Sequence, residues 1–310
     1  VVAGKVNDVG DLPSQCKHGM VVEVINSTAE EDNYFVKFFG NNDKDGEGTW
    51  EECAKPGRKI RFDRSTMPLV LIRTADGNFR LTEMDGSTYG VTTNQQQSAT
   101  FTSTTGNDTV TITKTGHGFQ TDDLVNVESS SLTNGQFIIT KINDNSFSFT
   151  SAANEGNHTN VACTIDVGFS APQWDDALVG DDVTNPEPSF VGKEINKMLF
   201  FRNRFCILSD EHIVMSRPGD FTNFWSKSAI SQIASDPIDI SASSSYPAIL
   251  YDGIETNTGL VLFSKNSQFM LTTDSDVFSP ITAKINALST YNFNFATNPI
   301  SLGTTIGFLD

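Results

Sequence analysis

Two pairs of carboxylates stand close together in the sequence and suggest acid–base chemistry on a glycan. Glu51 and Glu52 are adjacent, while Asp181 and Glu187 share one loop. Hydrolysis of a glycosidic bond requires one carboxyl group with a raised pKa and a second carboxylate at a fixed distance across the sugar. Neither adjacency nor a shared loop fixes such a distance. The sequence therefore selects no catalytic pair, and hydrolysis or binding of a glycan stays an alternative function.

The histidines offer no recognisable setting for a nucleophile. The motif Gly-x-Ser-x-Gly is absent, and the four histidines are far apart: His18, His117, His158 and His212. A nucleophile needs a base within hydrogen-bond reach, and nothing in the sequence supplies that pairing. His117 stands between two glycines with no second His or Cys nearby. We expect it to be a turn residue whose ring packs against the mouth of a small β-module.

A loop with alternating acidic residues suggests a calcium site. Asp43, Asp45 and Glu47 alternate within residues 40–48, which are rich in Gly and Asn. The loop lacks the downstream Glu and the flanking helices of an EF-hand, and it separates two strand-like segments. We therefore expect a solvated hairpin turn.

The cysteines indicate neither a zinc site nor a redox motif. They are widely spaced, with no Cys-x-x-Cys and no His at ligand spacing. Free thiols are expected at all four positions, which are Cys16, Cys53, Cys163 and Cys206. No metal and no cofactor is predicted.

The composition indicates an all-β protein with more than one domain. The chain has 310 residues, 23 of them Phe, and only 19% of its residues are charged. Such a composition is typical of aromatic-rich sheets, and a single core stops growing at about 250 to 300 residues. Apolar runs such as 68–72 and 259–263 have the length of a strand, not the roughly 20 residues of a membrane-spanning segment. The 38 acidic and 21 basic residues give a net charge of −17, which opposes binding to a phosphate backbone.

Hydrophobic alternation divides the chain into three predicted parts. Residues 1–87 form a β-meander with strands at 20–25, 34–39 and 48–52. Residues 88–170, rich in Thr, Ser, Asn and Gln, form an inserted small β-barrel or sandwich. Residues 171–310 form propeller-like blades that end unfinished, so both ends of the chain are expected to be cuts within a longer protein.

Within the inserted module, strands are predicted at 108–113, 123–127, 135–142 and 145–150. A carbohydrate-binding face would need exposed aromatic residues there. We expect its aromatic residues to form the core instead; they are Phe137, Phe147 and Phe149.

The third part contains a weak repeat. A hairpin at 198–210 continues into 213–216, and residues 259–272 repeat the pattern of apolar strand, Asn-containing turn and Phe-led strand. Phe205 and Phe269 occupy matching places, which suggests blades of a β-propeller. A terminal strand near Gly303 is predicted to begin a third blade.

Four segments together carry a family resemblance, and they are residues 66–79, 184–192, 200–204 and 235–239. In order and spacing they resemble tail tubular protein B, the nozzle protein of short-tailed phages of the autographivirus type. The resemblance extends over about residues 20–85 and 175–310, roughly two thirds of the chain, and corresponds to a central portion of the family. The Thr-rich module does not match the family pattern.

The resemblance implies a structural, non-enzymatic protein of the virion tail, assembled in the cytoplasm of the bacterial host. It implies a ring of six copies with a propeller-like platform. The implied partners are the tail adaptor protein, the tail fibre proteins and double-stranded DNA that passes through a central channel.

Two sets of residues are candidates for these roles. An acidic channel wall or loop tip is predicted at Asp175, Asp176, Asp181, Asp182 and Glu187, where a repulsive surface suits the passage of DNA. The alternative is an ordinary solvated loop.

Subunit contacts are predicted at Arg202, Arg204, Phe221 and Trp225, because aromatic residues and Arg are enriched at interfaces. The alternative is that Phe200, Phe201 and Phe205 fill the sheet core while both arginines lie in an exposed turn.

Overall fold

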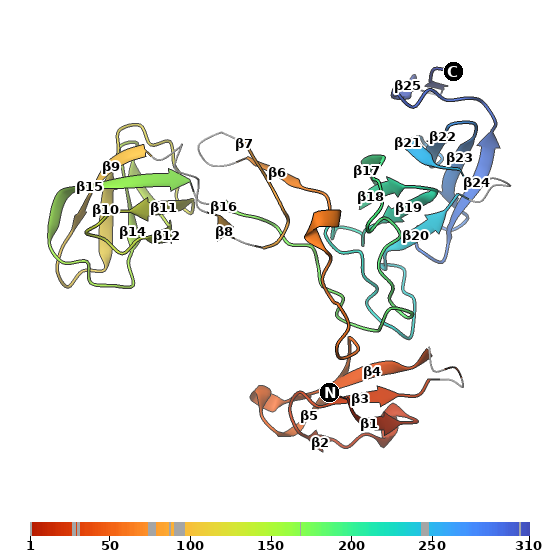
Figure 1. The fold of residues 1–310 in the computed structure, drawn as a ribbon, viewed down its shortest axis with the longest axis horizontal. Helices are drawn as coiled ribbons and strands as arrows, with labels where there is room; N and C mark the ends of the chain where they lie inside the picture. The colour runs from red at the N-terminus through yellow and green to blue at the C-terminus, as the bar shows by residue number, and fades with distance from the viewer. Residues whose placement is uncertain are drawn as a thin grey trace. The chain divides into compact units, whose positions relative to one another are not determined.

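The computed structural model describes residues 2–26, 29, 32–73, 79–86, 88–89, 97–167, 169–242, 248–303 and 305–310. The chain divides into two compact units: unit 1 comprises residues Val1–Met67 and Trp174–Asp310, and unit 2 comprises Pro68–Gln173. The predicted all-β class is confirmed (Figure 1). The helices among the described residues are three single turns, η1 (Val9–Asp11), η3 (Asn41–Asp43) and η4 (Arg64–Thr66).

Unit 1 begins with a five-stranded sheet in the order β1-β3-β4-β5-β2. Its strands are β1 (Val2–Val6), β2 (Gln15–Cys16), β3 (Val21–Val24), β4 (Tyr34–Gly40) and β5 (Gly46–Cys53). The predicted antiparallel meander is β3-β4-β5, and β1 runs parallel to β3 at the edge. One face is buried by Val22, Val24, Tyr34 and Val36. The acidic loop between β4 and β5 is largely exposed, as expected of a hairpin turn.

The later part of unit 1 contains two four-stranded antiparallel meanders. The first consists of β17 (Lys197–Phe201), β18 (Arg204–Ser209), β19 (His212–Met215) and β20 (Ile238–Ser241). The second consists of β21 (Leu250–Glu255), β22 (Leu260–Ser264), β23 (Gln268–Thr273) and β24 (Ala283–Ser289). The sheets share one core, to which Leu208 and Met215 contribute from the first and Leu262 and Leu271 from the second.

The second meander is covered on both faces, which explains its continuous apolar run. All five residues of β22 are buried, and Phe263 packs on Phe293 with ring centroids 4.8 Å apart. The strand near Gly303 belongs to a short pair, β25 (Ile300–Ser301) and β26 (Ile306–Gly307).

The predicted alignment of the repeat is wrong by one strand. Phe205 lies in the second strand of its meander, whereas Phe269 lies in the third strand of the other. The sequence did not reveal β21, because Asp252 and Gly253 interrupt it and both residue types are depleted in strands. Residues 218–225, which we call the aromatic turn, form turns without a helix.

Unit 2 is built on a curled seven-stranded sheet in the order β12-β11-β15-β9-β10-β14-β13. The strands are β9 (Gln97–Ser103), β10 (Thr109–Thr113), β11 (Leu124–Glu128), β12 (Gly135–Ile138), β13 (Thr140–Asn143), β14 (Ser146–Thr150) and β15 (His158–Val167). Its first and last strands are consecutive in the chain, so the sheet nearly closes into a barrel.

A single predicted strand at 135–142 is in fact two strands that meet at Ile139. β12 pairs with β11, and β13 pairs with β14 at the other edge of the sheet. Ile139 is buried, and its N–H donates to the carbonyl of Asp123 at 3.0 Å. The sequence does not show this change of partner, because Ile139 continues the apolar run of Phe137 and Ile138 and no Gly or Pro marks the corner.

The core of the barrel confirms the prediction for its aromatic residues. Phe147 and Phe149 are buried, and the half-buried Phe137 stacks on Phe149 with ring centroids 4.0 Å apart. The predicted inserted module lies within unit 2, which also contains two short pairs: β6 (Val70–Arg73) with β7 (Phe79–Thr82), and β8 (Thr88–Tyr89) with β16 (Phe169–Ser170).

Candidate functional site

The acidic segment 175–187 lies against residues 53–62, and we call this contact the interlock. The backbone joins them first: Lys55 N donates to Gly180 O at 2.9 Å, and Ala177 N donates to Ile60 O at 2.8 Å. Ala54 and Gly180 form an isolated parallel bridge. Two stretches that are far apart in the sequence therefore run together in unit 1.

Four ion pairs follow the interlock. They are Arg61–Asp176 at 3.2 Å, Lys55–Asp181 at 3.4 Å, Arg58–Asp182 at 3.2 Å and Lys59–Glu187 at 3.5 Å. Four of the five predicted channel carboxylates thus have a cation of the same chain beside them. The most exposed of the four is Asp182, whose side chain is 86% exposed.

Arg58 is the central residue of the interlock. Its side chain is only 1% exposed, and its guanidinium donates to the carbonyl oxygens of Val179, at 3.2 Å, and of Asn185. The same group lies 5.3 Å from the ring centroid of Trp225. Burial lowers the pKa of Arg58, while nearby carboxylates, Asp182 first among them, oppose that shift.

The fifth acidic candidate is held by the aromatic turn. Asp175 Oδ2 accepts a hydrogen bond from the Thr222 hydroxyl at 2.7 Å, and its backbone carbonyl accepts from Trp225 Nε1 at 2.8 Å. Trp225 is buried and stacks on Phe62, with ring centroids 4.7 Å apart. Its indole therefore contacts both sides of the interlock.

Hydrogen bonds within its own turn hold Asp181 in the ionised state. Burial raises the pKa of Asp181. The N–H groups of Thr184 and Val183, the Thr184 hydroxyl and Lys55 lower that pKa by more, so it lies below the ordinary value. A carboxyl group held ionised in this way cannot serve as the acid of a glycosidase.

Replacing Asp181 by Asn is expected to lower the free energy of unfolding by about 1 to 2 kcal/mol at pH 7. Because the pKa of Asp181 is lowered on folding, its contribution is present at neutral pH and is lost as the pH falls through the folded value. The deficit of the variant should therefore shrink below about pH 4. Urea titrations at pH 7 and in acid measure it. Asp182→Asn, at the exposed neighbour, is the control, and an equal deficit in both variants would contradict the assignment.

The other carboxylate pair is also unsuited to catalysis. Glu51 and Glu52 are neighbours in β5, so their side chains leave opposite faces of the sheet. Glu52 accepts hydrogen bonds from the Ser228 hydroxyl and the Ala229 N–H, both at 2.8 Å. These contacts make Glu52 a link between the first sheet and the loop that precedes β20.

The structure separates the predicted contact residues into buried and exposed side chains. Arg204 is 1% exposed and donates to Ser216 O at 2.8 Å, Asp236 O at 2.7 Å and Ala234 O at 3.0 Å. Trp225 is buried as described above. Arg202 is exposed at the turn between β17 and β18, and Phe221 is 41% exposed.

The alternative prediction for this hairpin is partly wrong. Phe201 is buried as expected, but Phe200 is 59% exposed and Phe205 is half-buried, and only one of the two arginines lies outside. The hairpin turn explains the difference, because Arg202 and Asn203 both have positive φ, 50° and 59°, and close β17 onto β18 in two residues. Arg204 is thereby the first residue of β18, where its side chain points inward.

Two of the exposed side chains, Phe200 and Phe221, are neighbours whose rings make an edge contact 5.1 Å apart. With the exposed Arg202 of the adjoining turn, whose guanidinium lies 5.7 Å from the ring centroid of Phe201, we call them the hairpin patch. Met198, 49% exposed, lies on the same face of β17 as Phe200.

The histidine between two glycines is structural, as expected. His117 is buried, its Nε2 lies 2.9 Å from Asn143 O, and its Nδ1 accepts from Phe119 N at 3.1 Å. Its ring contacts Phe147 edge-on, with centroids 5.1 Å apart. Across the described residues, no three His, Cys, Asp or Glu side chains are grouped so as to hold a metal ion.

The four cysteines are free thiols. Cys163 and Cys206 are buried, and burial raises their pKa to about 11 and about 12. Cys53 is half-buried, with a pKa raised to about 11 by the same cause. Thiols with such pKa values are protonated at neutral pH and are poor nucleophiles.

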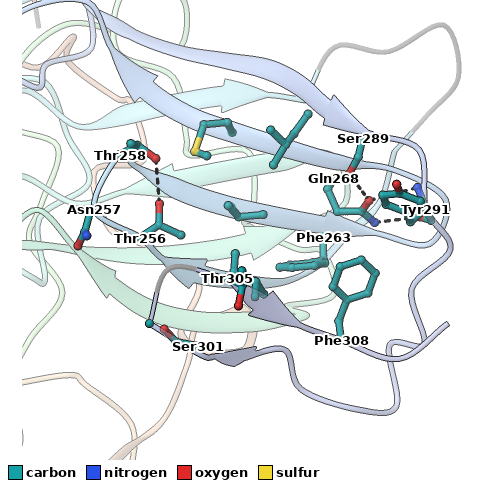
Figure 2. Close-up of a pocket in the computed structure, with 15 residues that line it drawn as sticks. Thr256, Asn257, Thr258, Phe263, Gln268, Ser289, Tyr291, Ser301, Thr305 and Phe308 are labelled. Carbon is teal, nitrogen blue, oxygen red and sulfur yellow. Dashed lines mark hydrogen bonds between the residues drawn. The ribbon is translucent and has the colours of Figure 1, made fainter.

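A cavity of about 460 Å³ lies between the second meander and the β25–β26 pair (Figure 2). Val261, Phe263 and Phe308 contribute apolar surface. At one end, Gln268 Nε2 donates to Tyr291 O at 2.9 Å. Its Oε1 accepts from the Ser289 hydroxyl at 2.7 Å. Among the residues that the structure describes, no charged side chain lines this cavity.

The sequence did not predict the interlock, although one signal for it was present. Lys55, Arg58, Lys59 and Arg61 gather four cations in seven residues of an otherwise acidic chain. Such a cluster indicates a nearby acidic partner, but the partner lies more than 110 residues away. In the described part of the chain, no helix has the length and hydropathy needed to cross a lipid bilayer.

Comparison with known proteins identifies the family. The sequence profile described as "Bacteriophage nozzle protein" matches residues 1–310. Over 140 residues the chain is 34% identical to tail tubular protein gp12 of Escherichia phage T7, a match that covers 45% of this chain and 18% of that protein. Among solved structures, the phage phi92 endosialidase aligns over 91% of this chain and 48% of its own, at 16% identity and a TM-score of 0.22. That score is too low for any structural argument. Because the nozzle profile covers the whole chain, this protein belongs to the bacteriophage nozzle protein family and is a structural component of a phage tail.

Proposed function

We propose that this chain forms part of the wall of a tail nozzle through which double-stranded phage DNA leaves the particle, without enzymatic activity of its own. The observation that carries the proposal is the match of the nozzle family over residues 1–310. The net charge of −17 supports it. At physiological ionic strength, charges act over a Debye length of about 8 Å, so an acidic wall repels a passing DNA duplex at short range and does not retain it.

In this proposal the carboxylates of the acidic segment have two roles: some stabilise the interlock, and others carry negative charge into solvent. Asp176 and Asp181 have side chains that are 18% and 13% exposed and therefore act mainly through their ion pairs with residues 53–62. Asp182 and Glu187, 86% and 41% exposed, direct negative charge to solvent and are the better candidates for a channel wall. Asp175 acts through its bonds to the aromatic turn.

The proposed assembly is a ring of six copies that contacts the tail adaptor protein and the tail fibre proteins. It resides in the virion tail after assembly in the cytoplasm of the host. Each of the two meanders has the strand order of a propeller blade, so a propeller-like platform is part of the proposal. The hairpin patch suits a contact between copies, since exposed aromatic residues and Arg dominate such contacts. Arg204 and Trp225 would act from within unit 1 by holding that hairpin and its neighbouring turn in place.

The full-length protein is expected to form a closed ring that does not retain DNA. Electron microscopy measures the first property and a gel-shift assay with duplex DNA at 150 mM salt measures the second. Non-specific DNA-binding proteins have dissociation constants of roughly 10⁻⁴ to 10⁻⁶ M, and this protein should bind more weakly than that range. A monomer that releases reducing sugar from bacterial envelope polysaccharide would replace the proposal with the glycan-hydrolysing alternative.

A further inference from the structure

A lysine, a carboxylate and an asparagine from three separate parts of unit 1 meet at one point, and we call them the crosslink site. Lys197 Nζ forms an ion pair with Asp252 Oδ2 at 2.9 Å and donates a hydrogen bond to Asn298 Oδ1 at 3.3 Å. Lys197 lies in β17 and Asp252 in β21, while Asn298 lies between β24 and β25. An amine, a primary amide and a carboxylate that moves protons are the groups required to link two side chains by an amide bond.

The carboxylate is the most buried member of the crosslink site. The side chain of Asp252 is 7% exposed and that of Lys197 is 32% exposed. Asp252 Oδ1 accepts from the N–H of Gly253 at 2.7 Å, so Oδ2 is the oxygen that faces the amine. Beside them, Asn196 Nδ2 donates to Leu250 O at 2.9 Å and joins the beginning of β17 to that of β21. The amine and the carboxylate are therefore positioned by two connected strands.

The amide is positioned by the residues on either side of it. Phe295 stacks on Tyr251 of β21, with ring centroids 4.6 Å apart. Pro299 is buried, and the residue before a proline is restricted to an extended backbone. Asn298 lies between these two anchors, and they keep its side chain beside Lys197.

The amine is close to the carbon atom that it would attack. Because the C–O bond of the amide is about 1.2 Å long, Lys197 Nζ lies no more than about 4.5 Å from Asn298 Cγ. Reacting atoms in a near-attack arrangement are about 3 to 3.5 Å apart, so a shift of about 1 Å is enough. Asparagine commonly loses ammonia by attack of the next backbone N–H on its side chain. That route is closed to Asn298, because Pro299 has no N–H.

We propose that unit 1 forms an isopeptide bond between Lys197 Nζ and Asn298 Cγ, with Asp252 transferring the protons. The Asp252 carboxylate takes a proton from the Lys197 ammonium, and the free amine forms a bond to Cγ while the carbonyl electron pair moves to Oδ1. Asp252 then protonates Nδ2 and takes one proton from the attacking nitrogen. The carbonyl forms again, the Cγ–Nδ2 bond breaks with its electron pair on nitrogen, and ammonia leaves. Asp252 releases the remaining proton to water, so the step needs no oxidant and no further reactant.

The bond crosses a large part of unit 1. Lys197 and Asn298 are 101 positions apart, and both four-stranded meanders lie between them in the chain. A link that closes so long a loop restricts the unfolded chain far more than the folded one. The two meanders therefore become more resistant to unfolding. This inference depends only on the folding of unit 1 and is independent of the nozzle function.

A second group of lysine, carboxylate and asparagine, in the first sheet, lacks the same arrangement. Lys5 Nζ lies 3.1 Å from Glu23 Oε1, and Asn33 Nδ2 donates to the same oxygen at 2.9 Å. Among the hydrogen bonds of the described residues, none joins Lys5 to the Asn33 amide. The side chain of Lys5 is also 52% exposed. We expect Lys5 to remain a free amine, which makes it an internal control.

The mass of the purified full-length protein tests the bond. We expect the intact chain to be lighter than its sequence by about 17 Da, the mass of one ammonia molecule. Digestion with trypsin should yield residues 194–202 linked to the peptide that contains Asn298, because trypsin does not cleave after a lysine whose amine is part of an amide. An unmodified mass with a free Lys197 overturns the proposal. A loss of about 18 Da, the mass of water, with a link from Lys197 to Asp252 also overturns it.

Substitutions of the two linked residues give an independent readout. Lys197→Arg keeps a positive charge beside Asp252 but has no nucleophilic amine, and Asn298→Ala removes an exposed amide. Both variants should have the mass of their sequence. Lys284→Arg, at another ion pair of unit 1, is the matched control and should keep the loss of ammonia. Persistence of the loss in either of the first two variants would place the link elsewhere and refute the assignment.

The role of Asp252 is tested by Asp252→Asn, which can still accept the hydrogen bond from Gly253. Removing a proton-transfer group should slow the appearance of the linked chain by roughly a hundredfold or more, followed by mass spectrometry from the time of synthesis. Circular dichroism verifies that the variant is folded. Bond formation at an unchanged rate in the folded variant would exclude Asp252 from the reaction.

Discussion

Replacing Arg58 by Met is expected to lower the free energy of unfolding of unit 1 by about 3 to 5 kcal/mol. The ion pair to the exposed Asp182 contributes little of this loss. The main cost comes from the carbonyl groups of Val179 and Asn185, which belong to buried residues and would lose a charged donor. The contact of the guanidinium with Trp225 is lost as well. Urea unfolding followed by tryptophan fluorescence measures the change.

Lys59→Met is the matched control for this prediction. Lys59 belongs to the same segment and also has an ion pair, with Glu187 at 3.5 Å, but its side chain is 58% exposed. Exposed pairs contribute about 0 to 1 kcal/mol, so the control should unfold close to the unaltered protein. If both variants lost the same stability, the interlock would depend on summed charge and not on the buried guanidinium.

Replacing Arg204 by Met is also expected to lower the free energy of unfolding of unit 1 by about 3 to 5 kcal/mol. Arg204 is buried and donates three hydrogen bonds to backbone carbonyls, those of Ser216, Ala234 and Asp236. Met fills a similar volume but satisfies none of these oxygens, so the loop that joins β19 to β20 would lose its anchor. A lower urea midpoint and faster proteolysis within residues 217–237 are the expected observations.

Arg202→Met provides the contrast two residues away. Arg202 is exposed and its φ of 50° disfavours Met and Arg alike, so the unfolding free energy should change by less than about 0.5 kcal/mol. The two variants also separate stability from assembly. Arg202→Met should weaken the proposed ring without unfolding the chain, whereas a ring of normal stability in this variant would exclude Arg202 from the subunit contact.

The sequence predicts the position of a strand correctly wherever a single apolar pattern corresponds to a single strand. The segments 34–39 and 145–150 were predicted from alternation and aromatic content, and the strands β4 and β14 confirm them. The failures have specific causes. β21 contains Asp252 and Gly253, and the corner at Ile139 lies inside an apolar run, so in both places local composition contradicts or hides the strand boundary.

The candidate site was less predictable than the fold, as the two arginines of one turn show. Arg202 and Arg204 are the same residue type two positions apart, yet one is exposed and the other is buried among backbone carbonyls. The sequence shows where an arginine stands. It does not show which backbone carbonyls will accept hydrogen bonds from that arginine, because every residue carries a carbonyl group. Their positions follow from loops at residues 216 and 234–236 that only the folded chain brings together.

The sequence by itself determined the all-β class, the acidic character and the membership in the nozzle family, because these depend on composition, local alternation and order along the chain. Only the tertiary structure decided that the acidic segment is paired with the cations at 55–61 and that the four-stranded meanders are offset by one strand from the apparent repeat. The physical reason is the distance along the chain over which each feature is determined. Alternation acts between neighbours in the chain, whereas the ion pairs of the interlock join segments more than a hundred residues apart, whose meeting is fixed by packing and not by either segment alone.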